Sequence, residues 1–153
     1  MTHLSILAEQ WLSEDGNGKM KVDVQLRNLP GTEAAVGWAG SHTIVADRPE
    51  GKAGGLGLGF NGAQLLALAL GGCFCNDLRY AAEELGVKLD NISVDVSLEL
   101  GGEPLVVTTA HMLVDCTTLD SSDPTLVVES ARSSCVVSNS LSVGVPVSIS
   151  MAG

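Results

Sequence analysis

The residues of this chain with the clearest capacity for covalent chemistry are its four cysteines. Cys73 lies in an apolar stretch, residues 65–75, and Cys135 lies far downstream in residues 134–141. A cysteine inside an apolar helix usually behaves as a small buried hydrophobe, and burial alone makes its thiol unreactive. A helix cysteine that meets a distant cysteine in the fold can instead support redox chemistry. Both interpretations of Cys73 are open on the sequence pattern alone.

The other two cysteines and the remaining motifs are less informative. Cys75 follows Cys73 by two positions and points to nearly the opposite side of a helix, so the pair is poorly placed for a disulfide or a zinc chelate. Cys116 fits a core position in a strand. No CxxC spacing occurs, and we expect no metal site. The motif G-x-G-x-x-G at residues 57–62 lacks a buried strand before it, and we expect no bound cofactor.

The segment that carries Cys73 has clear signals at both of its ends. Asn61 has the chemistry of a helix N-cap, and Gln64 stands three residues on as its capping-box partner. Gly86 is suited to the position that follows a helix. The sequence therefore predicts a helix from Asn61 to Leu85.

This long helix should have two different halves. Its first half is apolar on every side and should be buried all round. Gly71 and Gly72 would let another element pack closely, and close packing would offset a cost of about 1 kcal/mol for each glycine. The second half is amphipathic, and its apolar face is Leu78, Ala81, Ala82 and Leu85. Its polar face is Asp77, Glu83 and Glu84.

Hydrophobic alternation predicts most of the strands. Hairpin-type turns lie at residues 13–18 and 101–104, and a glycine-rich charged loop covers residues 47–59. Asp123 and Pro124 predict the start of a second helix, which runs to about residue 134. The predicted strands are residues 4–12, 20–26, 42–46, 92–100, 105–116 and 143–151.

The predicted order is β-β-β-α-β-β-α-β, which is an α+β fold in a single domain over residues 1–153. A long helix that is apolar all round is hard to bury in so small a monomer. We therefore expect a homodimer whose subunits cover each other's helix.

Composition and charge exclude several classes of function. Hydrophobic residues make up 45% of the 153 residues, which is enough for a core, and the formal net charge is −10. Clustered basic residues are needed to bind phosphate, so we expect neither nucleic acid nor a membrane surface as a partner. The longest apolar stretch is shorter than the ~20 residues of a membrane span, and no signal peptide is recognisable. These features favour a cytoplasmic protein with reduced thiols.

Two motifs in combination resemble the OsmC/Ohr family, which is named for osmotically inducible protein C and organic hydroperoxide resistance. The segment from Asn61 to Phe74 is similar to the family's helix N-P-E-x-L, alanine-rich stretch and C-F. Residues 135–141, which read CVVSNSL, are similar to the second motif, C-P-x-S-N. The resemblance covers most of the chain and implies an intertwined homodimer with long central helices. It also implies thiol-dependent reduction of organic hydroperoxides, with Cys73 as the peroxidatic cysteine and Cys135 as the resolving one. An external dithiol would reduce the resulting disulfide.

The chain departs from the family pattern near the thiol. Ala63 stands where the family has the glutamate that holds a catalytic arginine. That arginine belongs to the first hairpin, where a loose alignment places Glu14. Val136 replaces the proline of the second motif. Arg27, Arg48 and Arg79 are the candidates to replace the missing arginine through folding.

Three functions are therefore open. The first is an enzyme, a peroxiredoxin-like hydroperoxide reductase that uses Cys73 and Cys135. The second is a related thiol protein that acts on another small electrophile, a disulfide or a persulfide. The third is a homodimer without catalytic activity that binds a small ligand, because a fold does not fix a function.

Overall fold

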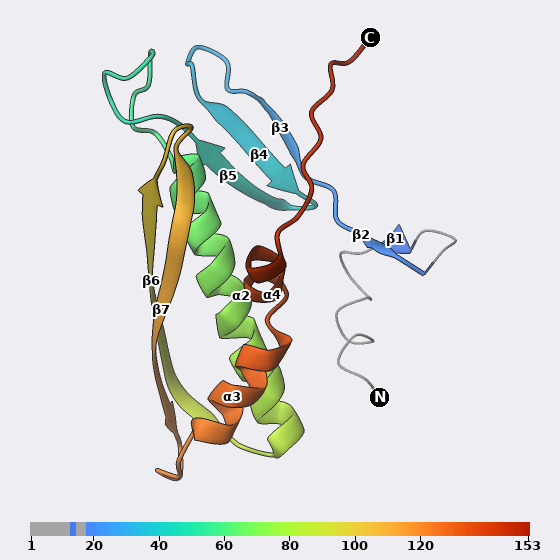
Figure 1. The fold of residues 1–153 in the computed structure, drawn as a ribbon, viewed down its shortest axis with the longest axis vertical. Coiled ribbons are helices and arrows are strands. Elements are labelled where there is room, and N and C mark those ends of the chain that lie inside the picture. The colour runs from blue at the N-terminus through green and yellow to red at the C-terminus, as the bar shows by residue number, and fades with distance from the viewer. Residues whose placement is uncertain (1–12, 15–17) are drawn as a thin grey trace. The chain divides into compact units, whose positions relative to one another are not determined.

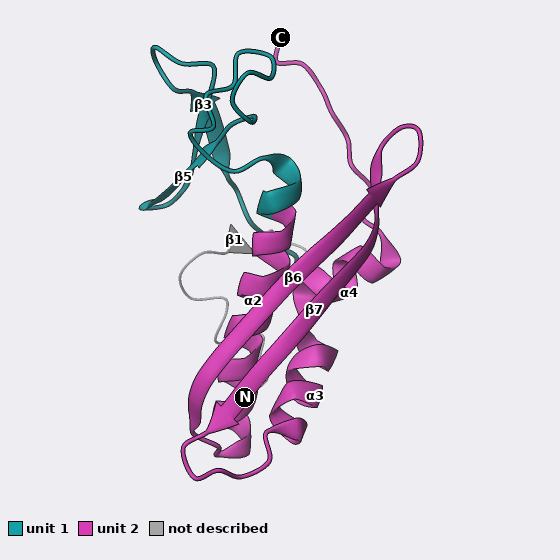
Figure 2. Cartoon of the chain, turned by 90° about the vertical axis from the view of Figure 1, so that its left-hand side faces the viewer, with its two compact units in different colours: residues 1–65 teal, residues 66–153 magenta. Residues whose placement is uncertain are grey.

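The computed structural model describes residues 13–14 and 18–153, so the strand predicted over residues 4–12 lies outside the described residues. The chain divides into two compact units, Met1–Leu65 and Leu66–Gly153 (Figure 2). Each unit is described by itself below.

Two small antiparallel sheets make up the described part of the first unit. Strands β1 (Ser13–Glu14) and β2 (Met20–Lys21) pair in antiparallel orientation, so Ser13 and Glu14 are strand residues and not part of the turn predicted over residues 13–18. The second sheet has the order β3-β4-β5. Its strands are β3 (Gln25–Asn28), β4 (Ala35–Ala39) and β5 (His42–Ala46).

These strands confirm one prediction and correct another. Strand β5 has the predicted bounds, His42–Ala46. The half-buried strand predicted over residues 20–26 is wrong, because β2 and β3 are separate, and their side chains are exposed. Strand β4 was not predicted, since its sequence AVGWA does not alternate in polarity. A Cβ at Gly37 would lie 3.2 Å from Leu26, so a small residue allows the close approach of β3 and β4.

The predicted loop over residues 47–59 is confirmed, and Asp47 organises it. The Asp47 carboxylate accepts backbone N–H hydrogen bonds from Arg48, Leu56 and Leu58 at 2.8–3.0 Å. These donors hold the pKa of Asp47 below its ordinary value of 3.8, against the opposing effect of burial. Loss of this carboxylate would leave three backbone donors in the loop without their partner.

Helix α2 (Gly62–Leu85) follows the loop and carries Cys73. The Asn61 side chain accepts a hydrogen bond from the Gln64 N–H at 2.9 Å, and the Gln64 side chain accepts one from the Asn61 N–H at 3.0 Å. This reciprocal pair is the predicted capping box. Gly86 ends the helix with φ of +67°, a conformation that costs glycine little.

The second unit packs the longer part of α2 between a β-ribbon and two shorter helices (Figure 1). The ribbon is β6 (Leu89–Gly101) paired with β7 (Val106–Thr118), as the alternating sequence predicts. The helices are α3 (Thr125–Ser134) and α4 (Val136–Val143). The carboxylate of Asp123 accepts the backbone N–H of Thr125. The predicted cap is wrong in its position, because Pro124 and not Asp123 is the N-cap residue of α3.

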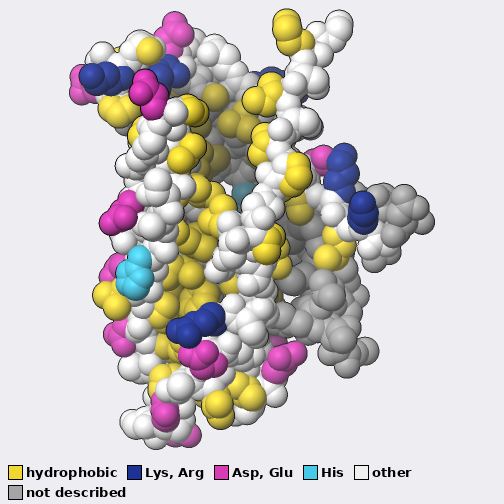
Figure 3. All heavy atoms as spheres, viewed as in Figure 1, with side chains coloured by type: hydrophobic (Ala, Val, Ile, Leu, Met, Phe, Trp, Pro, Cys, Tyr) yellow, Lys and Arg dark blue, Asp and Glu magenta, His cyan; other side chains and the backbone are white. Residues whose placement is uncertain are grey.

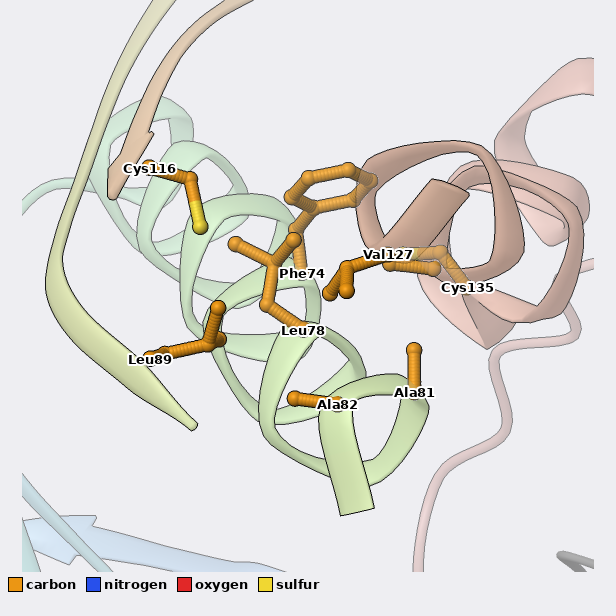
Figure 4. Packing of buried hydrophobic residues seen from close by; sticks show 9 residues of the cluster. Phe74, Leu78, Ala81, Ala82, Leu89, Cys116, Val127 and Cys135 are labelled. Carbon is orange, nitrogen blue, oxygen red and sulfur yellow. The ribbon is translucent and has the colours of Figure 1, made fainter. Parts of the chain in front are cut away.

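The core of this unit lies where α2, the ribbon and α3 meet. Leu78 and Phe74 of α2 pack with Cys116 of the ribbon and with Val127 of α3 (Figure 4). Gly71 brings α2 close to the ribbon, because a Cβ there would lie 2.9 Å from a methyl group of Val96. The close-packing prediction is thus confirmed for Gly71.

In the single chain, the predictions for Gly72, for burial of the first half of α2 and for Leu85 are wrong. Gly72 has open space around its Cβ position. The first half of α2 is not buried all round, since Leu68 is 50% exposed. Leu85, assigned to the apolar face, is also exposed. Figure 3 shows many hydrophobic side chains at the surface of the molecule.

The end of the chain also differs from the prediction. Residues 136–143 form α4, which the sequence pattern did not reveal, and residues 144–153 have no regular secondary structure. The strand predicted over residues 143–151 is therefore wrong for the isolated chain. Among the described residues no strand pairs with this segment. Its alternating apolar side chains are exposed, with Val147 at 83% and Ile149 at 94%. The mixed α+β class is confirmed.

None of the helices in the described residues is both long enough and apolar enough to cross a membrane.

Candidate thiol site

Helix α2 presents a thiol and a carboxyl group on one face. Cys73 and Asp77 are four positions apart, which places their side chains one above the other on a helix. The Cys73 thiol donates a hydrogen bond to Asp77 Oδ2, with 3.5 Å between sulfur and oxygen. Cys73 is half-buried, whereas only 5% of Asp77 is exposed. The helix thus holds the sulfur of Cys73 against a buried carboxyl group.

Cys135 is positioned by the junction of two helices. Its backbone N–H donates to the Ala131 carbonyl at the end of α3, and its carbonyl accepts the Asn139 N–H at the start of α4. Its side chain is fully buried, with 0% exposed, in the core cluster (Figure 4). Because both helices bond to this one residue, its backbone is held on either side, and its side chain is confined by the core around it.

The fold brings these three groups together. Cys73 Sγ, Cys135 Sγ and a carboxylate oxygen of Asp77 all lie within 4.8 Å of one another. We call these three residues the thiol site. Two of its members were predicted from the sequence, and the structure places them side by side in the second unit.

Burial controls the electrostatics of Cys135. Burial is the main cause that raises the pKa of the Cys135 thiol to about 12, and the nearby Cys73 and Asp77 contribute to the rise. The backbone N–H of Ser138, in the first turn of α4, acts in the opposite direction. Cys135 is therefore a protonated thiol at neutral pH. Since the thiolate is the nucleophilic form of cysteine, the more exposed Cys73 is the better placed nucleophile of the two.

The remaining two cysteines lie outside the thiol site. Cys75 is half-buried. Cys116 is a buried residue of β7, as predicted, and burial raises the pKa of its thiol while the charge of Arg79 lowers it. Neither belongs to the group of ligand atoms formed by the thiol site.

A groove of about 240 Å³ lies close to the thiol site. One wall comes from Leu70, which stands one turn before Cys73 on α2, and another from Ser138, one turn after Cys135. Four of its lining residues are apolar; the full lining is Leu70, Ala110, Met112, Ser138, Leu141 and Ser142. The groove thus combines apolar side chains with two serines, and its walls come from residues one helical turn away from Cys73 and Cys135.

Sequence reasoning missed Asp77 and placed it on the polar face of the helix. The structure corrects this, because the second half of α2 is covered on that side by the end of α3 and by Cys135. The spacing of four between Cys73 and Asp77 was the available signal, but the helix pattern alone does not show which distant segment covers it.

The residues expected to replace the family's arginine have other contacts. Arg27 lies 5.8 Å from the Trp38 ring centre, a cation–π distance, and Arg48 pairs with Asp47 at 3.5 Å. Both belong to the first unit. Arg79 is exposed on α2. Among the described residues, Asp77 has no ion-pair partner.

Two of the three family departures named above concern the missing glutamate and arginine. Ala63 lies in the first turn of α2, so no carboxylate projects from that position. Glu14 lies in β1, and its side chain is outside the described residues.

Comparisons with solved structures agree with this fold. An OsmC-like protein from Mycoplasma pneumoniae aligns with a TM-score of 0.66 and 15% identity, over 80% of this chain and 87% of the other. A Legionella pneumophila structure described as an organic hydroperoxide resistance protein OsmC and predicted redox protein aligns with a TM-score of 0.56 and 18% identity, over 78% and 87%. The organic hydroperoxide resistance protein OhrB of Bacillus subtilis aligns with a TM-score of 0.52 and 23% identity, over 77% and 87%.

These likenesses concern the fold, because their identities are low. No curated protein matches the chain. The family model described as OsmC-like protein matches residues 53–150, which contain the whole of α2, the ribbon and the thiol site. The chain therefore belongs to the OsmC-like protein family.

Proposed function

We propose that the protein is a thiol-dependent peroxidase that reduces small organic hydroperoxides with Cys73 and Cys135. The observation that carries this proposal is the approach of the two sulfur atoms to within 4.8 Å in a buried site. Membership of the OsmC-like family supports a redox role. Structural neighbours named for organic hydroperoxide resistance point in the same direction.

The reaction has two covalent steps. The Cys73 thiolate attacks one oxygen of the O–O bond, the bond breaks, and the other oxygen leaves with a proton as an alcohol. Cys73 is thereby oxidised to a sulfenic acid. The Cys135 thiol then attacks the sulfenic sulfur, water leaves, and a disulfide forms between the two cysteines. An external dithiol reduces this disulfide and returns both thiols.

Asp77 serves as the proton acceptor for Cys73 in this proposal. Its carboxylate already accepts the hydrogen bond of the Cys73 thiol, so it is within reach of the proton that must leave. The same group can return a proton to the departing alkoxide. This arrangement supplies part of what the family's arginine and glutamate would supply.

The groove beside the thiol site favours organic over inorganic peroxides. Its apolar lining includes Leu70, Ala110, Met112 and Leu141, which can contact an alkyl or aryl group. Hydrogen peroxide has no such group to bury. The substrate is therefore a hydroperoxide with an apolar substituent.

The protein acts as a homodimer in this proposal. The exposed Leu68 of α2 and the exposed apolar side chains of residues 145–151 form surfaces that a second subunit would bury. The other partner is the external dithiol. The acidic net charge of −10 supports neither nucleic acid nor an anionic membrane as a partner.

The test follows consumption of cumene hydroperoxide by the reduced protein with a dithiol present, in a buffer that contains a chelator. We expect Cys73→Ser to abolish consumption. Cys135→Ser should allow one equivalent to react and then stop, because no disulfide can form with its partner. Cys75→Ser is the matched control and should behave like the parent. A Cys73→Ser variant as fast as the parent would refute the proposal.

A second candidate function is reduction of small disulfides or persulfides by the same two thiols. The observation that favours it is the Asp77 carboxyl group beside Cys73, since proton transfer accompanies every thiol–disulfide exchange. The test is reduction of a small aromatic disulfide by the protein. Fast exchange with the disulfide and no consumption of hydroperoxide would select this function over the first.

A further inference from the structure

The thiol site contains three groups that are known metal ligands, and their geometry is close to that of a coordination shell. Two are thiols and one is a carboxyl group, so together they offer two sulfur donors and one oxygen donor. In a tetrahedral zinc site the bond lengths of about 2.0–2.3 Å place the ligand atoms roughly 3.4–3.8 Å apart. Cys73 Sγ and Asp77 Oδ2 are 3.5 Å apart, and all three ligand atoms lie within 4.8 Å of one another.

The elements that carry these ligands are suited to hold them. Cys73 and Asp77 are one turn apart on α2, so the helix itself sets their spacing. Cys135 is fixed by hydrogen bonds at the end of α3 and the start of α4. A rigid ligand set avoids most of the ordering cost that a flexible set pays when it binds a metal.

The charge of the site also fits a cation. Asp77 and Cys135 are buried, and the described residues supply no ion-pair partner for Asp77. Buried charges in proteins are usually paired or coordinate metals. Two thiolates and one carboxylate carry three negative charges, of which a divalent ion compensates two.

We propose that the reduced protein binds one zinc ion through Cys73 Sγ, Cys135 Sγ and a carboxylate oxygen of Asp77. Binding releases the two thiol protons to solvent and changes no oxidation state. Three protein ligands leave the fourth tetrahedral position for water or another small ligand, as in zinc sites that remain open. Thiolate sulfur favours zinc over the hard cations magnesium and calcium.

This inference does not depend on the proposed peroxidase reaction, which needs no metal. It also differs from the expectation drawn from the sequence, where only CxxC spacings and adjacent cysteines were considered. The ligands here come from a Cys-x-x-x-Asp pair on one helix and one cysteine from a distant junction. Bound zinc would hold both thiols, so metal binding and thiol chemistry would compete for the same atoms.

The first experiment titrates the full reduced chain with Co²⁺, whose thiolate complexes absorb by charge transfer in the near ultraviolet. We expect one Co²⁺ per chain and loss of the absorption when Zn²⁺ displaces it. Replacing even a residue behind a metal ligand costs about 10–100-fold in affinity, so Cys73→Ser, Cys135→Ser and Asp77→Asn should each weaken binding at least that much. Cys75→Ser and Cys116→Ser are the matched controls and should bind like the parent.

The second experiment needs no variant and is therefore independent of folding defects. Alkylation of the four thiols by iodoacetamide is followed by mass spectrometry with and without one equivalent of Zn²⁺. We expect zinc to slow alkylation of Cys73 and Cys135 relative to Cys75. Equal protection of all four cysteines, no protection, or unchanged Co²⁺ binding in the Asp77→Asn variant would overturn the zinc site. Hydroperoxide consumption measured with a chelator stays interpretable in each case, so failure of one proposal is separable from failure of the other.

Discussion

The buried carboxylate of Asp77 accepts the hydrogen bond of the half-buried Cys73 thiol. The pair is local, since one turn of α2 separates the two residues. The first prediction concerns what the carboxylate contributes.

Asp77→Asn should slow the reaction of Cys73 with cumene hydroperoxide by about 10²-fold, because an amide cannot receive the thiol proton. The second-order rate constant for the first turnover, measured in stopped flow with a chelator present, checks this. Asp95→Asn, an exposed position on β6, is the matched control and should leave the rate unchanged. An unchanged rate in the Asp77 variant would remove Asp77 from the reaction.

The groove can be tested by filling it. Ala110→Phe on β7 adds a ring to the lining of the groove beside the thiol site. We expect KM for cumene hydroperoxide to rise by about tenfold, which corresponds to about 1.4 kcal/mol of lost contact, while the rate with hydrogen peroxide changes little. Steady-state kinetics with both peroxides give the comparison. Equal losses for the two substrates would show that the groove does not select the organic group.

The two adjacent glycines of α2 should respond oppositely to the same substitution. Gly71→Ala places a methyl group 2.9 Å from Val96, and such overpacking costs about 1–3 kcal/mol. Gly72→Ala meets open space and should stabilise the helix by up to about 1 kcal/mol. Urea unfolding measures both free energies, and Val96→Ala should relieve the defect in the Gly71→Ala background. A Gly72→Ala variant that is destabilised would indicate that another subunit packs there.

Asp47 should make the stability of the chain sensitive to acid. The folded-state pKa of Asp47 lies below the ordinary value of 3.8, so the unfolded chain binds more protons than the folded chain between these two values. The stabilisation is therefore present above pH 3.8 and is lost as the pH falls through the lowered pKa. Comparing urea unfolding of the parent and Asp47→Asn across this range checks it. We expect the difference in free energy of unfolding between the two proteins to shrink toward low pH. A difference that stays constant with pH would contradict a lowered pKa for Asp47 in the folded chain.

The end of the chain offers a test of the dimer. Val147→Asp changes an exposed apolar position of the alternating segment, and Ser148→Asp changes its neighbour on the other face. If a second subunit covers the apolar face, Val147→Asp should lower the dimer population and Ser148→Asp should not. Light scattering after size-exclusion chromatography measures the mass. A parent protein that is monomeric, or two variants with the same mass as a dimeric parent, would refute this surface as the interface.

Local signals in the sequence predicted the parts of the fold that depend on nearby residues. The Asn61–Gln64 pair and Gly86 determined the bounds of α2, because capping chemistry acts within four residues. Hydrophobic alternation predicted the strands of the β6–β7 ribbon, because this pattern also depends only on residues close together in the sequence. Cys73 and Cys135 were identified through a family resemblance, not through periodicity, and the structure adds their approach to one another.

Features that depend on distant packing were not predicted. Asp77 has the sequence neighbours of a solvent-facing residue, yet it is buried and lies beside the distant Cys135. Residues 143–151 have the pattern of a strand, but a strand needs a partner, and none exists among the described residues of one chain. Helix α4 begins at Val136 with Cys135 as its N-cap and with no side-chain cap, so the sequence carries no capping signal for its start.

The position of Cys135 between α3 and α4 has a mechanical consequence. A disulfide bond is about 2.05 Å long, so the two sulfur atoms must move together when it forms. A shift of the Cys135 backbone would also displace the helices around it, because that backbone is bonded to Ala131 on one side and to Asn139 on the other. Helix α4 carries Ser138, Leu141 and Ser142, which line the groove. Forming the disulfide would therefore pull on one wall of the groove. Oxidation of the two cysteines would then also change the shape of the groove in which the hydroperoxide was bound.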